Sequence, residues 1–557
     1  MSSKYLYGID LGTTNSCIAY LNGEGKPEVI PNKENSRTTP SVVSLINGIE
    51  NPVVGEVAKD NAVFDAEYTI AYVKNKIGRK DEDGNELMCI YGPDAESEIS
   101  PVKVSSMILS KLVQDASEHM GEPVENVVIT VPAYFPTALR VATKKAGEDI
   151  GLNVLDIIEE PTAAAICYGC SKDVDGKRFL VYDLGGGTFD ITVMEVKEGR
   201  FEVVCSEGDH DLGGGRWDKS LYDYLLDKYR EETGDEEELS LDSEQDLISK
   251  SEKYKKQLSE LEVVKVPIRT ENDRAKIEVT RDKFDEITSV LLEETINLTK
   301  KAIAVSQGFA MGDAGEKDIS TILEEFSDKY DASKIDTILL VGGSTKMPQI
   351  KERVEKEFGV QTVSFDPDEA VAKGASIMAK IRQIPIPEPG VETGSGVKKP
   401  PVDIGTGSKL PPVLENSNVK DIIVRKNHKS YGIVVSYHDK PELEPDGYEV
   451  ISNLIMRDSK LPLINRNTYS VSEGAAIHHN IALRLCEHDS RDETILYDRK
   501  YEIFAQEVGI PEEAEEGTPI TVEMELLESG IFNVYLEILG KRIELEALYG
   551  TDKICNE

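Results

Sequence analysis

Residues 180–193 read LVYDLGGGTFDITV. Two apolar runs flank an acidic residue, three glycines and the step Thr-Phe-Asp, so the pattern predicts a β-hairpin with the glycines at its tip. Residues without a Cβ let successive backbone N–H groups converge on one anion, and such concavities bind phosphate. Asp183 and Asp190 flank the tip and offer the hard oxygen atoms that suit a magnesium ion or its water shell. For this stretch alone, a surface hairpin without a ligand is the alternative.

A similar plan occurs at the N-terminus, where residues 7–19 read YGIDLGTTNSCIA. The order is again strand, Asp-Leu-Gly, hydroxyl residues and strand. Two such hairpins, each opening one lobe, would hold a polyphosphate from opposite sides. The repeat therefore predicts two lobes with a phosphate-binding cleft between them.

Length and composition exclude several classes of protein. The 557 residues predict about three or four units of domain size. A formal net charge of −40 argues against nucleic acid or an anionic membrane surface as a partner. There is no apolar run of about eighteen residues and no signal-peptide core, so we expect a cytoplasmic protein. The seven scattered cysteines do not resemble a disulfide framework, and Cys167 and Cys170 lack the second pair or His cluster of a metal site.

The segment between the two hairpins contributes two further candidates. Its pattern predicts strand 39–45, helix 53–80, helix 102–119, strand 126–132 and strand 153–161. Lys74 falls in the second of these, where a lysine is ordinarily a solvated surface charge. Glu160 stands where a strand passes into a helix, at the kind of edge where ligands collect in α/β sheets. A helix-capping carboxylate is the alternative for Glu160.

The second lobe repeats the glycine theme. Residues 208–218 read GDHDLGGGRWD and predict a loop entering a helix near Lys219, with close backbone approach to a ligand. Residues 231–260 read as helical, and Thr280 caps a helix that runs to about Ser306. The lobe ends with the buried strand 337–341 and the turn 342–345.

The last third of the chain differs in composition and in its hydrophobic pattern. Residues 383–418 are rich in proline and glycine and predict a linker. From residue 419 onward, short alternating runs predict an all-β module.

Together these motifs resemble the 70-kilodalton heat-shock chaperone family, within the actin and sugar-kinase fold superfamily. The resemblance covers residues 4–382 and includes the strings IDLGTTNS at 9–16 and DLGGGTFD at 183–190. It implies an α/β actin-like ATPase domain over 1–382, made of two lobes with a duplicated ribonuclease-H-like core. It also implies a linker over 383–424 that ends in an apolar motif. An all-β sandwich that binds peptides follows over 425–557.

The resemblance assigns functional residues one by one. Lys74, Glu160, Asp183 and Thr188 would carry catalysis by positioning the attacking water and stabilising the γ-phosphoryl group. Asp10, Asp183 and Asp190 would hold Mg²⁺ or its waters, and K⁺ is a further candidate cation. The phosphates of ATP or ADP would lie against Gly12, Thr13, Thr14, Gly185, Gly186, Gly187 and Thr188, and the nucleotide would also contact Asn15, Gly214 and Gly215.

The adenosine pocket departs from the family pattern. It is assigned to Glu252, Lys255, Lys256, Ser259, Gly342, Gly343, Ser344, Lys346 and Asp368. Helical spacing alone makes the first four of these a solvated face. Lys256 and Lys346 stand where the family usually has arginines that stack on adenine, and a lysine lacks that planar face. We therefore expect a lower affinity for nucleotide.

Other assignments concern coupling and peptide binding. Pro132 and Arg140 match the family's switch proline and relay arginine. The peptide pocket is assigned to Ile433, Tyr469, Ile481 and Leu483, although alternating apolar residues of a sandwich are core by default.

Asp156 and Lys426 reverse the charges that the family uses with J-domain partners, so a dedicated J-domain-type co-chaperone and exchange factor are expected. The chain stops at Glu557, soon after its last strand, so no helical lid is expected.

The resulting hypothesis is an ATP-dependent molecular chaperone, an ATP hydrolase that couples its nucleotide state to binding of unfolded or extended apolar polypeptide clients. Such a protein would serve protein folding and the stress response. Two alternatives remain. One is a small-molecule kinase of the actin fold, which the C-terminal β-module disfavours. The other is a nucleotide-bound scaffold or partner-specific binding module with little or uncoupled ATPase activity.

Overall fold

A computed structural model describes most of the chain. The described residues are 5–79, 86–93, 97–133, 135–171, 174–197, 200–235, 237–270, 273–307, 330–382, 423–424, 429–437, 448–456, 459–488, 490, 494–527 and 529–545. They belong to two compact units. The first lies within Met1–Tyr134, Ala142–Phe309 and Leu323–Ile423, and the second includes Phe135–Val141 and Val424–Glu557. The predicted linker falls outside the described residues, except for its last two positions.

The first hairpin sits in a six-stranded sheet with the order β11-β10-β1-β2-β3, in which β4 also pairs with β2. Strands β1, β10 and β11 are parallel, and β2 and β3 run antiparallel to them. Their bounds are Tyr7–Asp10 for β1, Asn15–Leu21 for β2, Pro27–Val29 for β3, Thr39–Pro40 for β4, Asn126–Val131 for β10 and Asn153–Glu159 for β11. This sheet is the base of the first lobe.

The second hairpin sits in a sheet of the same plan, with the order β18-β17-β12-β13-β14-β19. Strands β12, β17 and β18 are parallel, and β13 and β14 are antiparallel. The bounds are Arg178–Leu184 for β12, Phe189–Lys197 for β13, Arg200–Asp209 for β14, Thr337–Val341 for β17, Thr362–Ser364 for β18 and Ile423–Val424 for β19. Three parallel strands followed by two antiparallel strands therefore occur twice, which confirms the predicted duplication of the hairpin.

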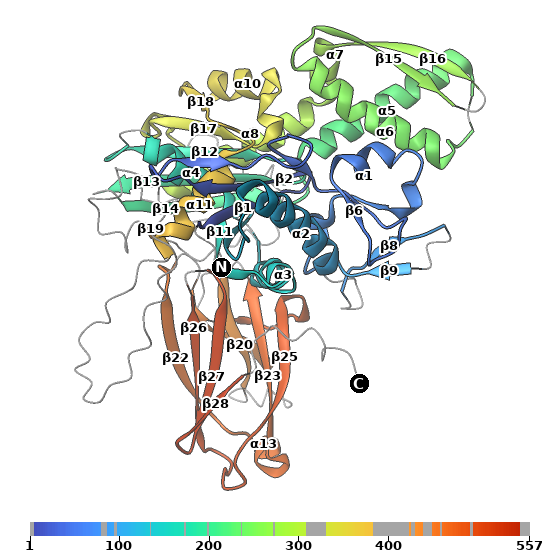
Figure 1. Ribbon diagram of the computed structural model, residues 1–557. Coiled ribbons are helices and arrows are strands. Elements are labelled where there is room, and N and C mark those ends of the chain that lie inside the picture. The colour runs from blue at the N-terminus through green and yellow to red at the C-terminus, as the bar shows by residue number, and fades with distance from the viewer. Residues whose placement is uncertain are drawn as a thin grey trace. The chain divides into compact units, whose positions relative to one another are not determined.

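Two helices join the lobes at their base. Apolar residues of α4 (Glu160–Ser171) and α11 (Ala370–Arg382) share one buried core with strands of both sheets. At their crossing, a Cβ on Gly374 would lie 1.8 Å from the carbonyl oxygen of Ala163, so only glycine fits there. Both helices lie among the strands of the two sheets (Figure 1). The close crossing of α4 and α11 therefore connects the two lobes through one packed core.

The predicted helix over 53–80 is wrong. Gly55 has φ 95° and Tyr72 has φ 55°, and these left-handed residues interrupt any continuous helix. The predicted strand 39–45 is likewise divided, because β4 pairs with β2 whereas β5 belongs to a separate three-stranded sheet. The segment forms β5 (Val43–Ser44), β6 (Val53–Val54), α1 (Glu56–Asn61), η1 (Ala66–Tyr68), β7 (Thr69–Ile70) and η2 (Val73–Asn75).

Helices elsewhere agree better with their predicted periodicity. The helix predicted over 102–119 is α2, which Ser100 caps by accepting a hydrogen bond from Lys103 N at 3.2 Å. The helix predicted near Lys219 begins earlier, at Gly214. The remaining helical bounds are Pro101–Met120 for α2, Thr137–Glu148 for α3, Gly214–Thr233 for α5, Leu241–Leu258 for α6, Arg281–Ile287 for α7, Ser289–Ser306 for α8, Gly343–Lys346 for η4 and Pro348–Phe358 for α10.

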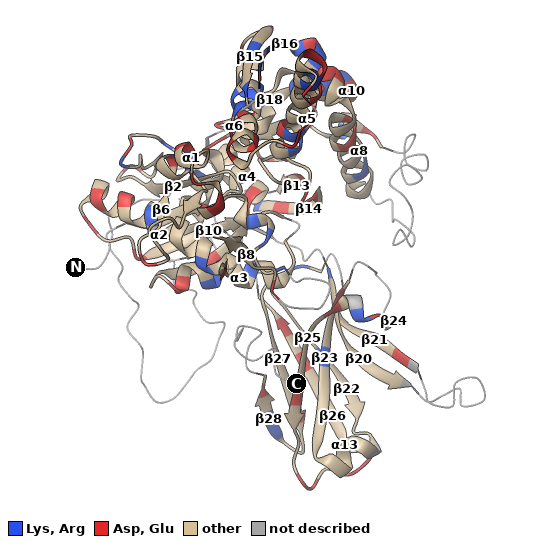
Figure 2. Ribbon diagram, turned by 90° about the vertical axis from the view of Figure 1, so that its right-hand side faces the viewer, with Lys and Arg blue, Asp and Glu red and all other residues tan. Residues whose placement is uncertain are grey.

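Two predicted long helices are each divided. Residues 231–260 contain the end of α5 and all of α6, because Gly234 ends α5 in the left-handed conformation. The helix that Thr280 caps is α7, and a break at Thr288 separates it from α8. Charges of both signs are interspersed on α5 and α6 (Figure 2). Trp217 of α5 is fully buried in the core of this lobe.

The second unit contains the predicted all-β module. A five-stranded sheet with the order β24-β21-β20-β23-β25 and a four-stranded sheet with the order β22-β26-β27-β28 share one apolar core. All their pairings are antiparallel. The bounds are Ser430–Tyr437, Tyr448–Ile455, Leu463–Ser470, Asn480–His488, Thr494–Leu496, Glu502–Gly509, Pro519–Leu526, Phe532–Ile538 and Lys541–Glu544 for β20 to β28 in order. Across the described parts of the chain, no helix has the length and apolar character needed to cross a bilayer.

Candidate active site

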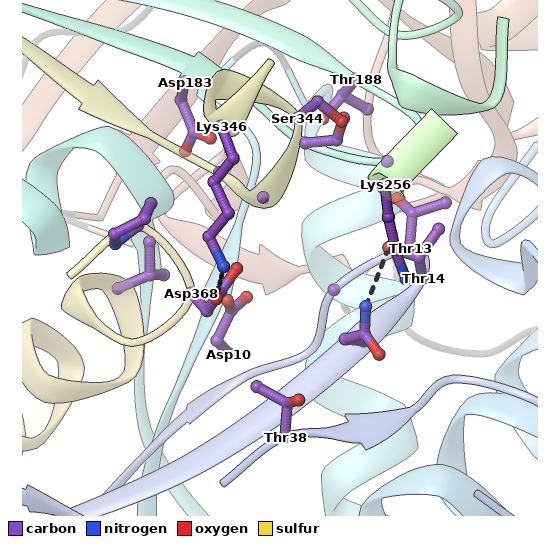
Figure 3. Close-up of a pocket in the computed structure, with 18 of the residues that line it drawn as sticks. Asp10, Thr13, Thr14, Thr38, Asp183, Thr188, Lys256, Ser344, Lys346 and Asp368 are labelled. Atoms are coloured by element: carbon purple, nitrogen blue, oxygen red, sulfur yellow. Dashed lines mark hydrogen bonds and ion pairs between the residues drawn. The ribbon is translucent and has the colours of Figure 1, made fainter. Parts of the chain in front are cut away.

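A cavity of about 560 Å³ lies between the tips of the two hairpins (Figure 3). It gathers residues from β1, β12, η2, α4, α6 and η4, which are far apart in the sequence. The predicted site residues that line it are Asp10, Gly12, Thr13, Thr14, Asn15, Lys74, Glu160, Asp183, Gly185, Gly186, Thr188, Glu252, Lys255, Lys256, Ser259, Gly342, Gly343, Ser344, Lys346 and Asp368. One cavity therefore gathers these predicted residues from both lobes.

The glycine tip of the second hairpin lies directly against threonine side chains of the first hairpin. A Cβ on Gly186 would lie 2.3 Å from Thr14 Cγ2 of the opposite hairpin. A Cβ on Gly187 would lie 2.6 Å from Thr13 Cγ2. Both distances are far below van der Waals contact, so glycine is required at each position. The bare backbone agrees with the phosphate-cradle interpretation of this tip.

The third glycine cluster supports the second hairpin from behind. Gly214 N donates to Gly185 O at 3.0 Å, and Gly215 N donates to Gly186 O at 2.8 Å. Gly187, Gly214 and Gly215 were predicted to contact nucleotide, but they are absent from the residues that line this cavity. The described backbone bonds instead give Gly214 and Gly215 a role in fixing the hairpin tip.

Lys74 and Glu160 form a buried ion pair. Lys74 follows the left-handed Tyr72 in η2, and Glu160 begins α4 directly after β11. The Lys74 side chain is 4% exposed, which excludes the solvated-lysine alternative. Both side chains line the cavity, so the fold presents a cation and a carboxylate to the space between the hairpins.

Asp10 and Asp183 bring further negative charge to the same wall. Burial raises the pKa of Asp10 to about 7, and the charge of Glu160 contributes, while Lys74 opposes the rise. Thr130 Oγ1 donates to Asp10 Oδ1 at 3.1 Å. Burial raises the pKa of Asp183 well above its ordinary value, followed by the charges of Glu160, Asp190 and Asp10. This concentration of buried carboxyl groups suits a bound cation.

The carboxylates fit magnesium through its water shell. Among the described residues, no three His, Cys, Asp or Glu side chains come close enough together to ligate one metal ion directly. Asp10 and Asp183 both line the cavity, and Mg²⁺ commonly keeps several waters when proteins bind it. Asp190 is the register partner of Asp183 across β12 and β13, but it is not among the cavity-lining residues.

The predicted adenosine end is held by ion pairs. Lys256 Nζ donates to Glu252 Oε1 at 2.6 Å, and Lys59 Nζ lies 2.7 Å from Glu252 Oε2. Burial raises the pKa of the Glu252 carboxyl, but these lysines outweigh it and bring the pKa down to about 2. Lys346 forms an ion pair with Asp368 on the facing wall (Figure 3). Lys256 and Lys346, the two lysines predicted to stand in place of arginines, are therefore both engaged by carboxylates.

Lys255 and Asp218 form a second buried pair. Lys255 Nζ donates to Asp218 Oδ2 at 2.8 Å and to Gly214 O at 3.0 Å, and so holds the glycine cluster in place. Sequence reasoning missed Asp218, although it lies in the same stretch as the glycine cluster, shortly after Gly215. It also missed Lys59, for which the sequence carries no local signal because its partner lies on a distant helix.

Comparison with known proteins agrees with this geometry. A family model described as Hsp70 protein matches residues 6–386. The chain belongs to the Hsp70 family. It is 39% identical over 400 residues to the chaperone protein DnaK of Anaplasma marginale (strain St. Maries). The aligned region covers 68% of this chain and 58% of that relative, so the chain spans less than two thirds of the relative's length.

Pro132 and Arg140 are the two residues predicted to couple the Hsp70 domains. Pro132 directly follows β10 and is buried. Arg140 Nε donates to Phe135 O at 3.0 Å, and both residues belong to the segment grouped with the second unit. Their predicted role in coupling stays a prediction.

The predicted Hsp70 peptide pocket coincides with the core of the sandwich. Ile433 and Leu483 are buried, and Tyr469 and Ile481 are partly buried against the same core. Tyr469 Oη donates to Ser452 Oγ at 3.0 Å. This placement is what the core alternative expects, so the peptide pocket also stays a prediction.

Asp156, which was predicted to carry a charge reversed from the family pattern, is paired within the fold. Arg382 Nε, at the end of α11, donates to the buried Asp156 Oδ2 at 2.7 Å. Lys426, the other reversed charge, lies outside the described residues.

Proposed function

We propose that this Hsp70 family member is an ATP-dependent chaperone that hydrolyses ATP in the cavity between the hairpins. The observation that carries the proposal is the buried pair of Lys74 and Glu160, which lines one cavity with Asp10, Asp183 and the glycine tip. Phosphoryl transfer to water requires mainly orientation and charge neutralisation. The chain places groups for both tasks in the same cavity.

The residues divide the chemical work as follows. Backbone N–H groups of the hairpin tips bind phosphate, and the Lys74 ammonium stabilises negative charge that develops on the transferring group. Glu160 orients Lys74 through their ion pair and accepts a proton from the attacking water or holds that water in place. Asp10 and Asp183 would hold the water shell of a Mg²⁺ ion, and that ion would supply further neutralisation of phosphate charge.

The second half of the proposal concerns the β-sandwich. An antiparallel sandwich is suited to bind extended apolar segments by strand addition, with main-chain hydrogen bonds for affinity and side-chain pockets for specificity. Unfolded or extended polypeptides are the proposed clients, with a J-domain-type co-chaperone and an exchange factor as further partners. Nucleotide binding closes the two lobes about a hinge, and this closure changes the affinity of the sandwich for peptide.

A nucleotide-bound scaffold with little turnover is the second candidate. Its support is the engagement of Lys256 by Glu252 and of Lys346 by Asp368, because paired ammonium groups offer adenine no stacking face. Such a site would hold nucleotide weakly or as a structural ligand.

Single-turnover ATP hydrolysis by Lys74→Met tests the enzyme. We expect a rate at least ~10²-fold slower than wild type, because a preorganised charge at the developing negative charge is lost. ADP affinity, measured by isothermal titration, should change far less and shows that the variant is folded. Lys76→Met is the matched control, since Lys76 lies in the same segment and does not line the cavity.

Two outcomes decide between the candidates. Wild-type turnover no faster than that of Lys74→Met would contradict the ATPase and favour the scaffold. Turnover in wild type that an extended apolar peptide leaves unchanged would keep the ATPase and reject the coupled chaperone.

A further inference from the structure

A second cavity of about 340 Å³ lies behind the glycine tip of the second hairpin. It shares Gly186 and Asp218 with the first cavity. The first lobe contributes Tyr72 and Asn75 to its wall, and the second lobe contributes residues of α5 and α6 and the loop before α5. A ligand in this cavity would therefore touch both lobes without entering the first cavity.

Large apolar side chains stand at the rim of this second cavity. Tyr72 and Ile248 come from opposite lobes and are 37% and 39% exposed. Tyr222 of α5 adds a second ring. Tyr72 is held at φ 55°, and a strained backbone persists only where the surrounding structure enforces it. The rim therefore presents aromatic and aliphatic surface from both lobes.

The charges around the cavity favour a cation. Arg216 Nη1 donates to Glu294 at 3.1 Å, and Lys219 Nζ donates to Asp223 at 2.6 Å, so both basic side chains are engaged by carboxylates that do not line the cavity. Asp211 and Glu244 also line it, and within the described residues no ion pair engages their carboxylates. The cavity wall therefore retains net negative charge.

A buried acceptor in the wall lacks a donor. Asp218 is 8% exposed, and its Oδ2 accepts from Lys255, whereas its Oδ1 has no hydrogen-bond partner among the described residues. Buried polar atoms are nearly always hydrogen-bonded, so a lone acceptor beside a cavity indicates a missing donor. Asn75 Oδ1, on the opposite lobe, is a second buried acceptor in the same condition.

We propose that this second cavity binds a small organic cation with a planar apolar ring and N–H donors. The ring lies between Tyr72 and the pair Tyr222 and Ile248, and the cationic nitrogen donates toward Asp218. The charges of Asp211 and Glu244 favour the cation over a neutral or anionic analogue. Because the ligand spans both lobes, it slows their separation and so slows nucleotide release from the first cavity.

Tryptamine is the probe, and indole-3-acetate is the probe of opposite charge with the same ring. Binding is measured by isothermal titration on the full chain in saturating Mg²⁺ and ADP, so that the first cavity is filled. We expect one tryptamine per chain, binding of indole-3-acetate at least about tenfold weaker, and slower release of a fluorescent ADP when tryptamine is present.

Variants on one helix locate the site. Glu244→Gln should weaken tryptamine binding by about fivefold through loss of one facing charge, and Ile248→Ser by about tenfold through loss of apolar contact. Asp242→Asn removes a charge from the same first turn of α6, but Asp242 does not line the cavity, so its affinity should match wild type.

Three results would overturn the proposal. They are displacement of tryptamine by ADP, equal binding of indole-3-acetate, and equal effects of Glu244→Gln and Asp242→Asn. If the chain bound no ADP, the proposed ATPase would fail, whereas tryptamine binding and its loss in Glu244→Gln would still report on this cavity.

Discussion

Asp10 stands at the end of β1, where it is half-buried and lines the first cavity, with Glu160 nearby and a hydrogen bond from Thr130. A carboxyl in this position is easier to protonate than in an unfolded chain, because burial disfavours its charged form. Its pKa of about 7 lies above the ordinary value of 3.8. Between these two values the folded chain binds a proton that the unfolded chain has lost.

This titration predicts a pH dependence of stability in the absence of magnesium and nucleotide. The free energy of unfolding should fall as pH rises from about 5 to 8, because the native state holds the extra proton and must lose it. Asp10→Asn removes that titration, so its stability should fall less over the same range. Urea unfolding at pH 5.5 and pH 7.5 measures the difference.

The exposed Asp242→Asn serves as the control and should keep the wild-type slope. Identical slopes for wild type and Asp10→Asn would show that Asp10 is not the group that holds the proton.

For individual residues, sequence reasoning succeeded where a motif places the residue next to a glycine turn. Asp10, Asp183 and the glycines were found in this way, and resemblance added Lys74 and Glu160. Asp218 and Lys59 were missed, because each acts through a partner on another element. Their roles depend on tertiary pairing, which one sequence does not encode locally.

The short helix α1 and the long helix α6 come from different lobes and are joined by the ion pair of Lys59 with Glu252. Glu252 also accepts a hydrogen bond from Lys256 on its own helix, and this bond orients its carboxylate toward Lys59. This pair ties the lobes together beside the predicted adenosine end of the first cavity.

Breaking the interlobe pair should release nucleotide faster. We expect Lys59→Ala to raise the dissociation rate of a fluorescent ADP by about two- to fivefold, the range for a partly exposed ion pair. Stopped-flow displacement with excess ADP gives the rate. Lys250→Ala breaks a pair with Asp246 inside α6 alone and should leave the rate unchanged. If both variants behaved alike, the pair between lobes would have no special role.

At the scale of elements, long regular patterns were predictable and short irregular ones were not. Helix α2 and the buried strands followed their periodicity. The segment 53–80 did not, because left-handed residues at Gly55 and Tyr72 divide it into short pieces. Helix α5 begins within the glycine cluster because Gly214 and Gly215 donate to the carbonyl groups of another hairpin.

The whole molecule has a built-in reporter of its first unit. Trp217 is the only tryptophan of the chain and is fully buried in the core of the second lobe. Tryptophan emission therefore follows unfolding of the first unit, whereas far-UV circular dichroism follows both units.

Magnesium and ADP should shift the tryptophan transition alone. At a ligand concentration of about 100 Kd, the first unit gains ~2.7 kcal/mol of stability, because the ligand binds its native state only. Thermal unfolding followed by both signals should then separate the transition of the β-sandwich from the shifted one. A shift of equal size in both signals would mean that the two units unfold together.

The duplicated sheets and the β-sandwich were predictable because each has its own sequence pattern. The repeated hairpin motif predicted the duplicated sheets, and the alternating runs beyond residue 419 predicted the sandwich. The peptide site was less accessible to sequence reasoning. Apolar residues at alternating positions serve a core and a binding groove equally well, and Ile433 and Leu483 do occupy the core.

The glycine tip of the second hairpin sets a limit on how this molecule can change. A methyl group at Gly186 would collide with Thr14 of the facing hairpin and would keep the two hairpins apart. Any larger side chain would hold them further apart. The absence of a side chain at Gly186 therefore allows the two hairpins to approach this closely.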